Sequence, residues 1–207
     1  MRFIMSENLI GRVLLVILLL VPSSYAFSED ISYSYVQATY VHTTIDLSGS
    51  IDDVEGDGFG FSLSLDINPN LAFTLSVIST TFKTFQGIEV DNTKMTDLGI
   101  TAHTDITPKT DIFANLSLTK AEITVPDSSS SDNDKDYGSI FSIGLRHMMT
   151  KGFELELGAS NTEVFDTTTF EYNLDARVYF RKVFSLGFGY ISSDNADSFL
   201  LNIRMDV

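Results

Sequence analysis

Apolar and polar residues alternate one by one along most of the chain after residue 27. In one such segment, Phe59, Phe61, Leu63, Leu65 and Ile67 alternate with glycine, serine and aspartate. An alternation with period two is typical of β-strands that have one apolar face. No segment in this part of the sequence has the periodicity of an amphipathic helix. The sequence therefore predicts an all-β fold.

Ten segments are predicted to be strands, and the first of them, residues 33–41, is less cleanly patterned than the others. The connections between them alternate in length. Four are tight, at residues 68–70, 107–110, 149–152 and 181–183. Five are longer, at residues 43–57, 82–92, 124–137, 161–169 and 192–197. Short periplasmic turns and long extracellular loops are the layout of outer-membrane barrels. We therefore expect an antiparallel up-and-down transmembrane β-barrel of ten strands, with both ends in the periplasm. Eight strands is the alternative, if the first segment or one hairpin lies outside the barrel.

The first 26 residues have a different pattern from the rest of the chain. A positively charged start is followed by an apolar run at residues 13–21, and small residues precede a cleavage site after Ala26. This is the pattern of a secretory signal peptide. The apolar run is shorter than the ~20 residues of a spanning helix, which makes a membrane anchor the less favoured interpretation. We predict a signal peptide at 1–26 and an outer-membrane β-barrel domain at 27–207.

Three features indicate that the apolar faces of the strands meet lipid rather than a soluble core. The polar faces are rich in glycine and serine, which suit the crowded lumen of a narrow barrel. The segments have the length of about nine to eleven residues that a tilted spanning strand needs. Aromatic residues gather at strand ends, as in the girdles at the two membrane interfaces: Phe59, Phe153, Phe170, Phe180, Phe184, Tyr190 and Phe199. A soluble barrel or sandwich is the alternative.

The composition excludes some classes of function. The net charge of −15 disfavours nucleic acid as a partner, because a duplex-binding protein needs a positive surface to displace the counterions of phosphate. The chain has no cysteine, so it has neither a disulfide framework nor a cysteine-based metal site. No sequence motif for a cofactor is present, and we expect none to bind.

Charged residues on the polar faces are expected to pair inside the barrel, because an unpaired buried charge is costly. The tight turn at 149–152 would place Arg146 roughly opposite Glu154, and the next connection would place Glu154 opposite Arg177. The predicted lumen network also includes Glu156, Asp175 and Arg204. We interpret it as a plug of salt bridges that fixes the strand register. A gated pore lined by charge is the alternative.

The histidines are the candidates for acid–base chemistry. His103 lies near Asp105 and His147 lies near a tight turn, whereas His42 is placed near the outer rim, with Asp46 close in sequence. No motif of a hydrolase, a phosphate-binding loop or a zinc site accompanies them. We therefore expect no enzymatic activity, and keep a barrel enzyme acting on lipid or peptide as an alternative centred on His42.

The predicted first loop is strongly acidic, with Asp52, Asp53, Glu55 and Asp57. Calcium prefers several carboxylate oxygens. One hypothesis is therefore that divalent cations bridge this loop to phosphates of lipopolysaccharide. The other interpretation is solubility alone.

The chain resembles small outer-membrane barrels of the type of OmpX, the OmpA membrane domain and the opacity proteins. The resemblance rests on the segment from Tyr33 to Val41, the acidic loop and Gly58 to Gly60, which are similar to a short surface-antigen-like barrel. It implies insertion by the barrel assembly machinery. Such barrels usually end in an aromatic residue that this machinery reads, whereas this chain ends in Val207.

We expect from these observations a non-enzymatic surface protein in the outer membrane, which contributes to envelope integrity or adhesion through acidic extracellular loops. Its partners would be membrane lipid and lipopolysaccharide. A narrow porin-like channel for small solutes is the alternative.

Overall fold

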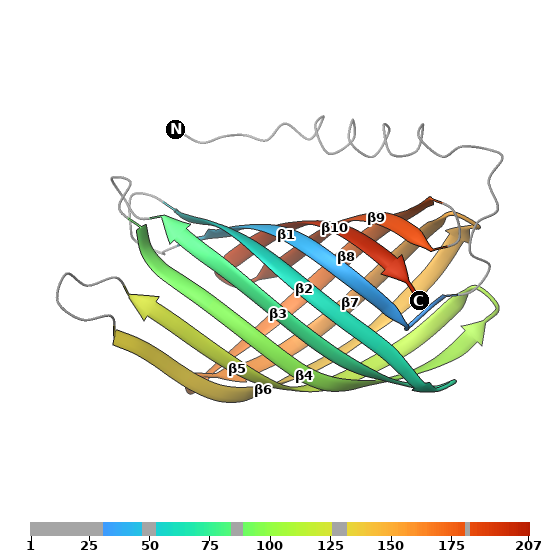
Figure 1. The fold of residues 1–207 in the computed structure, drawn as a ribbon, viewed down its shortest axis with the longest axis horizontal. Helices are drawn as coiled ribbons and strands as arrows, with labels where there is room; N and C mark the ends of the chain where they lie inside the picture. Colours follow the sequence, from blue (N-terminus) through green and yellow to red (C-terminus); the bar gives the residue numbers. More distant parts are fainter. Residues whose placement is uncertain (1–30, 47–52, 84–88, 126–131, 181–182) are drawn as a thin grey trace.

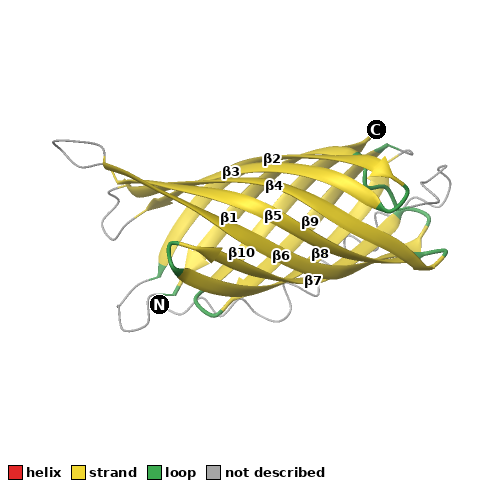
Figure 2. Ribbon diagram, turned by 90° about the horizontal axis from the view of Figure 1, so that it is seen from below, coloured by secondary structure: helices red, strands yellow, loops and turns green. Residues whose placement is uncertain are grey.

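The computed structural model describes residues 31–46, 53–83, 89–125, 132–180 and 183–207. Over these ranges ten strands form one closed antiparallel barrel, shown from two sides in Figures 1 and 2. The strands are β1 (Tyr35–Ile45), β2 (Val54–Asn68), β3 (Leu71–Lys83), β4 (Glu89–Thr107), β5 (Thr110–Val125), β6 (Asp132–Thr150), β7 (Phe153–Val164), β8 (Thr167–Phe180), β9 (Phe184–Ser193) and β10 (Ala196–Asp206). Each strand pairs with its neighbours in sequence, and β1 pairs with β10 to close the barrel. The prediction of a ten-stranded barrel is confirmed, and the eight-stranded alternative is wrong.

The predicted signal peptide at 1–26 lies outside the described residues. Within the part of the chain that is described, no helix is long and apolar enough to cross a bilayer.

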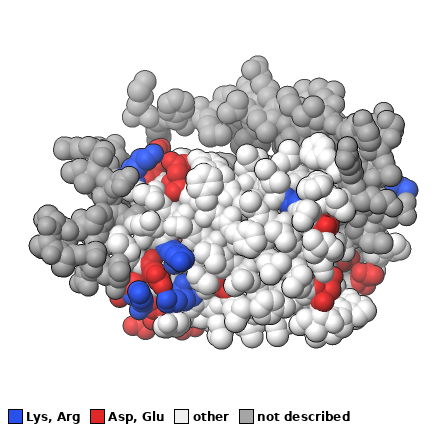
Figure 3. Space-filling view, in the orientation of Figure 1, with Lys and Arg blue, Asp and Glu red and all other residues white. Residues whose placement is uncertain are grey.

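The two faces of the barrel wall differ as the alternation predicts. The lumen side buries small and polar residues, including Ser64, Thr101, Ser117, Thr119 and Asn202. The outer side exposes large apolar residues on every strand, and Leu118, for example, is 70% exposed. Figure 3 shows the resulting belt of uncharged surface across the middle of the barrel, with charged groups gathered toward its ends. An exposed apolar surface of this extent is typical of a membrane-embedded protein.

Glycine on the lumen side makes room for larger neighbours. A Cβ atom on Gly144 would lie 2.6 Å from the ring of Phe113, which projects into the lumen from the adjacent strand. The lack of a side chain at residue 144 therefore lets an aromatic ring fill part of the interior.

The strands continue into the segments that the sequence suggested were loops. The prediction of long connections at 161–169 and 192–197 is wrong: β7 and β8 are joined by Phe165 and Asp166 alone, and β9 and β10 by two residues. The reason is that the β-branched threonines at 167–169 pair with β7, which extends the hairpin. Similarly, β4 and β6 are each 19 residues long and take up much of the predicted loops at 82–92 and 124–137.

The long strands make one side of the barrel taller than the other. A tilted strand crosses the bilayer in about nine to eleven residues, so β4, β5 and β6 extend well beyond it, whereas β9 and β10 have 10 and 11 residues. The tight turns and the C-terminus lie at the opposite end, on the right in Figure 1. We call the part of β4, β5 and β6 that extends beyond the bilayer, at the end away from the tight turns, the outer wall.

Both residues of the β7–β8 turn have positive φ angles, 52° at Phe165 and 54° at Asp166. A two-residue hairpin turn of this kind favours asparagine and glycine, and a bulky residue is strained there. We predict that Phe165→Asn raises the free energy of unfolding by about 1 kcal/mol. The measurement is the temperature at which the folded band disappears in a heat-modifiability gel. Thr167→Asn, just outside the turn, is the control and should give no gain; an equal or larger gain there would contradict the explanation.

Candidate functional site

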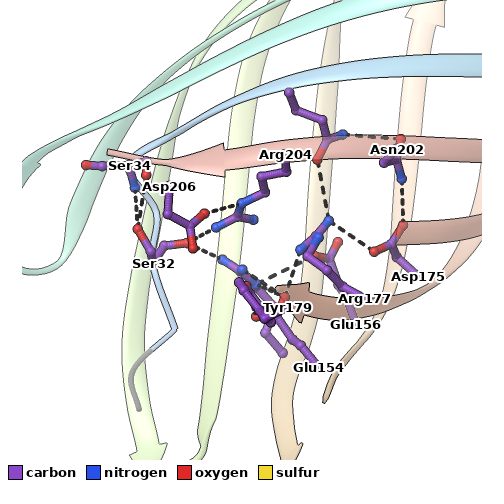
Figure 4. A network of polar contacts seen from close by, with 12 residues as sticks. Ser32, Ser34, Glu154, Glu156, Asp175, Arg177, Tyr179, Asn202, Arg204 and Asp206 are labelled. Atoms are coloured by element: carbon purple, nitrogen blue, oxygen red, sulfur yellow. Dashed lines mark hydrogen bonds and ion pairs between the residues drawn. The ribbon is translucent and has the colours of Figure 1, made fainter. Parts of the chain in front are cut away.

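A buried carboxylate forms the centre of the lumen. Glu154 on β7 is fully buried, and its Oε1 accepts hydrogen bonds from Arg146 Nη2 at 2.8 Å and Arg177 Nη1 at 2.9 Å. Its Oε2 accepts a hydrogen bond from the hydroxyl of Tyr179 at 2.9 Å. Figure 4 shows how the labelled members of this group converge from neighbouring strands. Both carboxylate oxygens are therefore bonded, as a buried anion requires.

Further polar groups extend this cluster across the barrel. Arg177 Nη2 lies 3.0 Å from Asp175 Oδ1, and the other oxygen of Asp175 accepts a hydrogen bond from Asn202 at 2.9 Å. Arg204 Nε lies 2.6 Å from Asp206, and Arg146 Nε lies 3.7 Å from Glu156. The structure thus brings the six residues of the predicted lumen network into one cluster, called the lumen network below.

The register of one pair differs from the expectation. Arg146 is directly opposite Glu156, and Met148 is opposite Glu154. The turn consists of Lys151 and Gly152, with an irregularity between Met148 and Thr150, and the pairing is displaced by two residues from the expected one. The expected position of Arg146 opposite Glu154 is therefore wrong, although its long side chain reaches the carboxylate diagonally. Arg177 lies opposite Glu154, as the next connection suggested.

The segment just before β1 closes the end of the barrel that carries the tight turns. The ring of Tyr33 is buried, stacks on His103 at 3.6 Å and lies 4.6 Å from the guanidinium of Arg146. The carbonyl oxygen of Ser32 accepts hydrogen bonds from Arg146 at 2.9 Å and from Arg204 at 2.6 Å. The sequence alone does not indicate this role, because Tyr33 has the pattern of the start of a strand.

Beside the network the lumen holds a polar cavity of about 230 Å³. Its lining includes Tyr35, Gln37, Ser64, Thr74 and Asn202. The guanidinium of Arg204 lies 3.9 Å from the ring of Tyr35 and borders this space. The cavity has room for water or a small solute, but the network closes it on one side.

The three histidines lie in separate environments. His42 faces outward and its Nδ1 lies 2.9 Å from Asp57. Within the described residues this is the one hydrogen bond of its ring. His103 faces the lumen, 3.6 Å from Asp66, and His147 contacts Thr110 at 2.8 Å. They do not form a common site.

The acidic residues of the first loop are divided by the structure. Asp52 lies outside the described residues, whereas Asp53 precedes β2 and Glu55 and Asp57 belong to that strand. Asp57 faces outward beyond the girdle residue Phe59, and it accepts hydrogen bonds from Tyr40, His42 and Lys83. Among the described residues no group of three or more histidine or acidic side chains could hold a metal ion.

The aromatic residues that were predicted to form the girdles all project outward, in two groups. Three lie at the end with the tight turns: Phe153, Phe180 and Phe184. Four lie toward the other end: Phe59, Phe170, Tyr190 and Phe199. In the second group, the ring centroids of Tyr190 and Phe199 are 5.1 Å apart, and Phe59 packs against Tyr40 at 5.5 Å. These aromatic residues border the apolar belt on both sides.

The closed sheet, the apolar belt and the polar lumen define a transmembrane β-barrel protein. The chain belongs to the family described as the outer membrane protein β-barrel domain, which matches residues 13–191. It is thus an outer-membrane protein.

Solved structures of small outer-membrane barrels are similar in fold. Neisserial surface protein A is 16% identical, with 85% of this chain and 98% of that chain covered and a TM-score of 0.46. The attachment invasion locus protein Ail of Yersinia pestis is 10% identical, with 84% and 95% covered and a TM-score of 0.42. The β-domain of the Bordetella autotransporter BrkA is 12% identical, with 85% and 100% covered and a TM-score of 0.51. No curated protein sequence matches the chain significantly.

Removing the central charge should destabilise the barrel. Glu154→Gln leaves the guanidinium groups of Arg146 and Arg177 buried without the anion between them. Breaking a buried ion pair in this way costs about 3 kcal/mol. We expect the urea midpoint of unfolding in detergent to fall accordingly. Glu163→Gln, an exposed substitution on the same strand, is the matched control and should change it little. Equal midpoints for the two variants would show that the network does not stabilise the fold.

The bonds to Asp57 predict a pH dependence. Hydrogen bonds from Tyr40, His42 and Lys83 hold the pKa of Asp57 well below its usual range. Its contribution to stability is therefore present above the ordinary pKa of about 4 and is lost as the pH falls through the lowered value. Asp57→Asn should lower the melting temperature at pH 7 and make its decline in acid shallower. Asp134→Asn, on the exposed part of β6, is the control; an unchanged acid profile of Asp57→Asn would refute the assignment.

Proposed function

We propose that this protein is a closed, non-enzymatic outer-membrane barrel that acts through its extracellular end, in envelope integrity or adhesion. The observation that carries the proposal is the buried lumen network together with the segment of residues 32–33 that packs against it. These groups occupy the interior where a pore would run.

The charged side chains of the lumen are paired with one another. Arg146, Glu154, Arg177 and Arg204 are all at most 4% exposed. A conducting pore displays its charges to water, whereas here they form hydrogen bonds across the interior. In a narrow barrel, side chains readily fill the lumen in this way. The network therefore supports a closed barrel.

The outer wall is a polar surface away from the membrane. On β6, Asp134 and Asp136 lie in the same phase as the lumen residue Arg146, whereas Lys135 lies in the opposite phase. The wall is hydrogen-bonded sheet, and its exposed residue Asp134 is available to macromolecules outside the cell. A polar extracellular end of this kind supports a role in surface contact.

A narrow channel for small solutes is the second candidate. The polar cavity of about 230 Å³ favours it, since a modest rearrangement of the network would lengthen that space. The two candidates differ in whether ions cross the resting barrel.

Conductance in planar bilayers separates the two candidates. We expect no steady conductance from the wild-type barrel, and a steady one from the double variant Arg146→Ser with Glu154→Ser, which removes one positive and one negative charge and so leaves the net charge of the lumen unchanged. The matched control, Asp57→Ser with Lys83→Ser, removes an outward-facing ion pair and should remain closed. A steady wild-type conductance would favour the channel.

Whole cells test the surface role. Cells that lack the protein should become more sensitive to detergent or adhere less to surfaces, and the wild-type chain should restore both properties. His42→Ala should restore them equally well. A failure of that variant at normal surface abundance, with a loss of lipid acylation or proteolysis, would favour the enzyme alternative.

A further inference from the structure

Three lysines project from the outer side of the wall, on adjacent strands. The three lysines are Lys94 on β4, Lys120 on β5 and Lys135 on β6. Each lies an even number of residues from an outward apolar residue of its own strand (Leu98, Leu118 and Tyr137, respectively) and therefore on the same face of the sheet. Lys94 and Lys135 are exposed, and Lys120 is half-buried. All three side chains therefore leave the barrel on its lipid side, not toward the lumen.

The three ammonium groups surround a single carboxylate. Glu122 is directly opposite Lys94 on one side and Lys135 on the other, and Lys120 is bonded to it. That hydrogen bond lowers the pKa of Glu122, so the carboxylate stays charged and holds Lys120 in place. Three positive charges and one negative charge leave this cluster at +2, in a chain with a net charge of −15. We call Lys94, Lys120, Lys135 and Glu122 the basic cluster.

The height of the basic cluster coincides with the upper edge of the apolar belt. Lys120 follows Leu118 by two residues, which is about 7 Å along a strand. Tyr137 is opposite Lys120 on β6 and is 74% exposed, as an interfacial aromatic would be. Figure 3 shows charged groups gathered at this end of the surface, directly beside the uncharged belt. At this depth the phosphate groups of membrane lipids lie next to a barrel.

On β6, the acidic residues Asp134 and Asp136 and the basic residue Lys135 lie on opposite faces of the wall. On β6, Lys135 and Tyr137 point outward, whereas Asp136 points to the other face and bonds to the backbone N–H of Phe165. The excess of acid in the chain thus does not cancel the positive charge on the lipid side. This arrangement attracts an anion that approaches from the membrane.

We propose that the basic cluster binds the phosphorylated head group of a lipid in the outer leaflet, with the acyl chains of that lipid lying along the apolar residues below. Lysine binds phosphate as a point charge and needs no bidentate geometry. The acyl chains would contact Leu98, Leu116 and Leu118, which are exposed in the two rows beneath the lysines. This site lies on the lipid side of the wall, so it goes beyond the proposed role and does not depend on whether the lumen is closed.

The test uses the full-length mature barrel refolded in detergent and purified lipid A with two phosphates, with binding measured by native mass spectrometry. The double variant Lys94→Gln with Lys135→Gln keeps the bond between Lys120 and Glu122. The matched control, Lys109→Gln with Lys151→Gln, makes the same charge change at the tight turns of the opposite end. Each lysine near an anionic lipid surface is worth about fivefold in affinity, so we expect the first variant to bind about 30-fold more weakly and the control to bind as the wild type does.

Two further arms identify the ligand. Lipid A stripped of its phosphates should bind the wild type about as weakly as phosphorylated lipid A binds the first variant. Inorganic phosphate at millimolar concentration should not displace lipid A. Any of three results would overturn the proposal. The first is an equal loss of affinity for lipid A in both double variants, and the second is that the wild type binds dephosphorylated lipid A as tightly as phosphorylated lipid A. The third is displacement of lipid A by free phosphate. Heat-modifiability gels verify that every variant is folded, so a failure to fold cannot imitate a loss of binding.

Discussion

The pairing of β1 with β10 is the interaction on which the whole structure depends. In hydrocarbon no water is available for backbone N–H and C=O groups, so a sheet can cross a membrane only if it closes on itself. The register from Tyr35 with Asp206 to Ile45 with Ala196 joins the two ends of the described chain and leaves no open edge. Once the sheet is closed, one face of every strand must meet lipid and the other must fill a narrow lumen.

The lumen network follows from that confinement. The interior is too narrow for bulk water, so each charge needs a partner. Glu154 is the hydrogen-bond partner of Arg146, Arg177 and Tyr179. Because a slip of one residue would turn Arg146 or Arg177 outward into lipid, the network also specifies the register. On β6 the charges of the outer wall are also divided by face, with Asp134 and Asp136 on the side of Arg146 and Lys135 on the opposite side.

The sequence predicts the features that depend on periodicity and misses those that depend on particular side chains. The alternation around Phe59 and its equivalents predicts the barrel and the face that meets lipid, and together with the lengths of the connections it favours ten strands over eight. The short connection at Phe165 has no clear signal in the sequence, because polar threonines are common in loops, yet they pair well in a β-ladder. The diagonal reach of Arg146 depends on an irregular turn, and the burial of Tyr33 depends on space inside the closed barrel; neither has a local signal. The signal peptide stays a prediction.

The carbonyl oxygen of Ser32 has a consequence for the order of assembly. It accepts hydrogen bonds from Arg146 and from Arg204, which are distant from it in sequence and meet it only when the sheet is complete. Contacts between such remote parts of a chain form late, since closing long loops is entropically unfavourable. We therefore expect the two bonds of Ser32 to form only after β1 has paired with β10, so that they report a completed barrel.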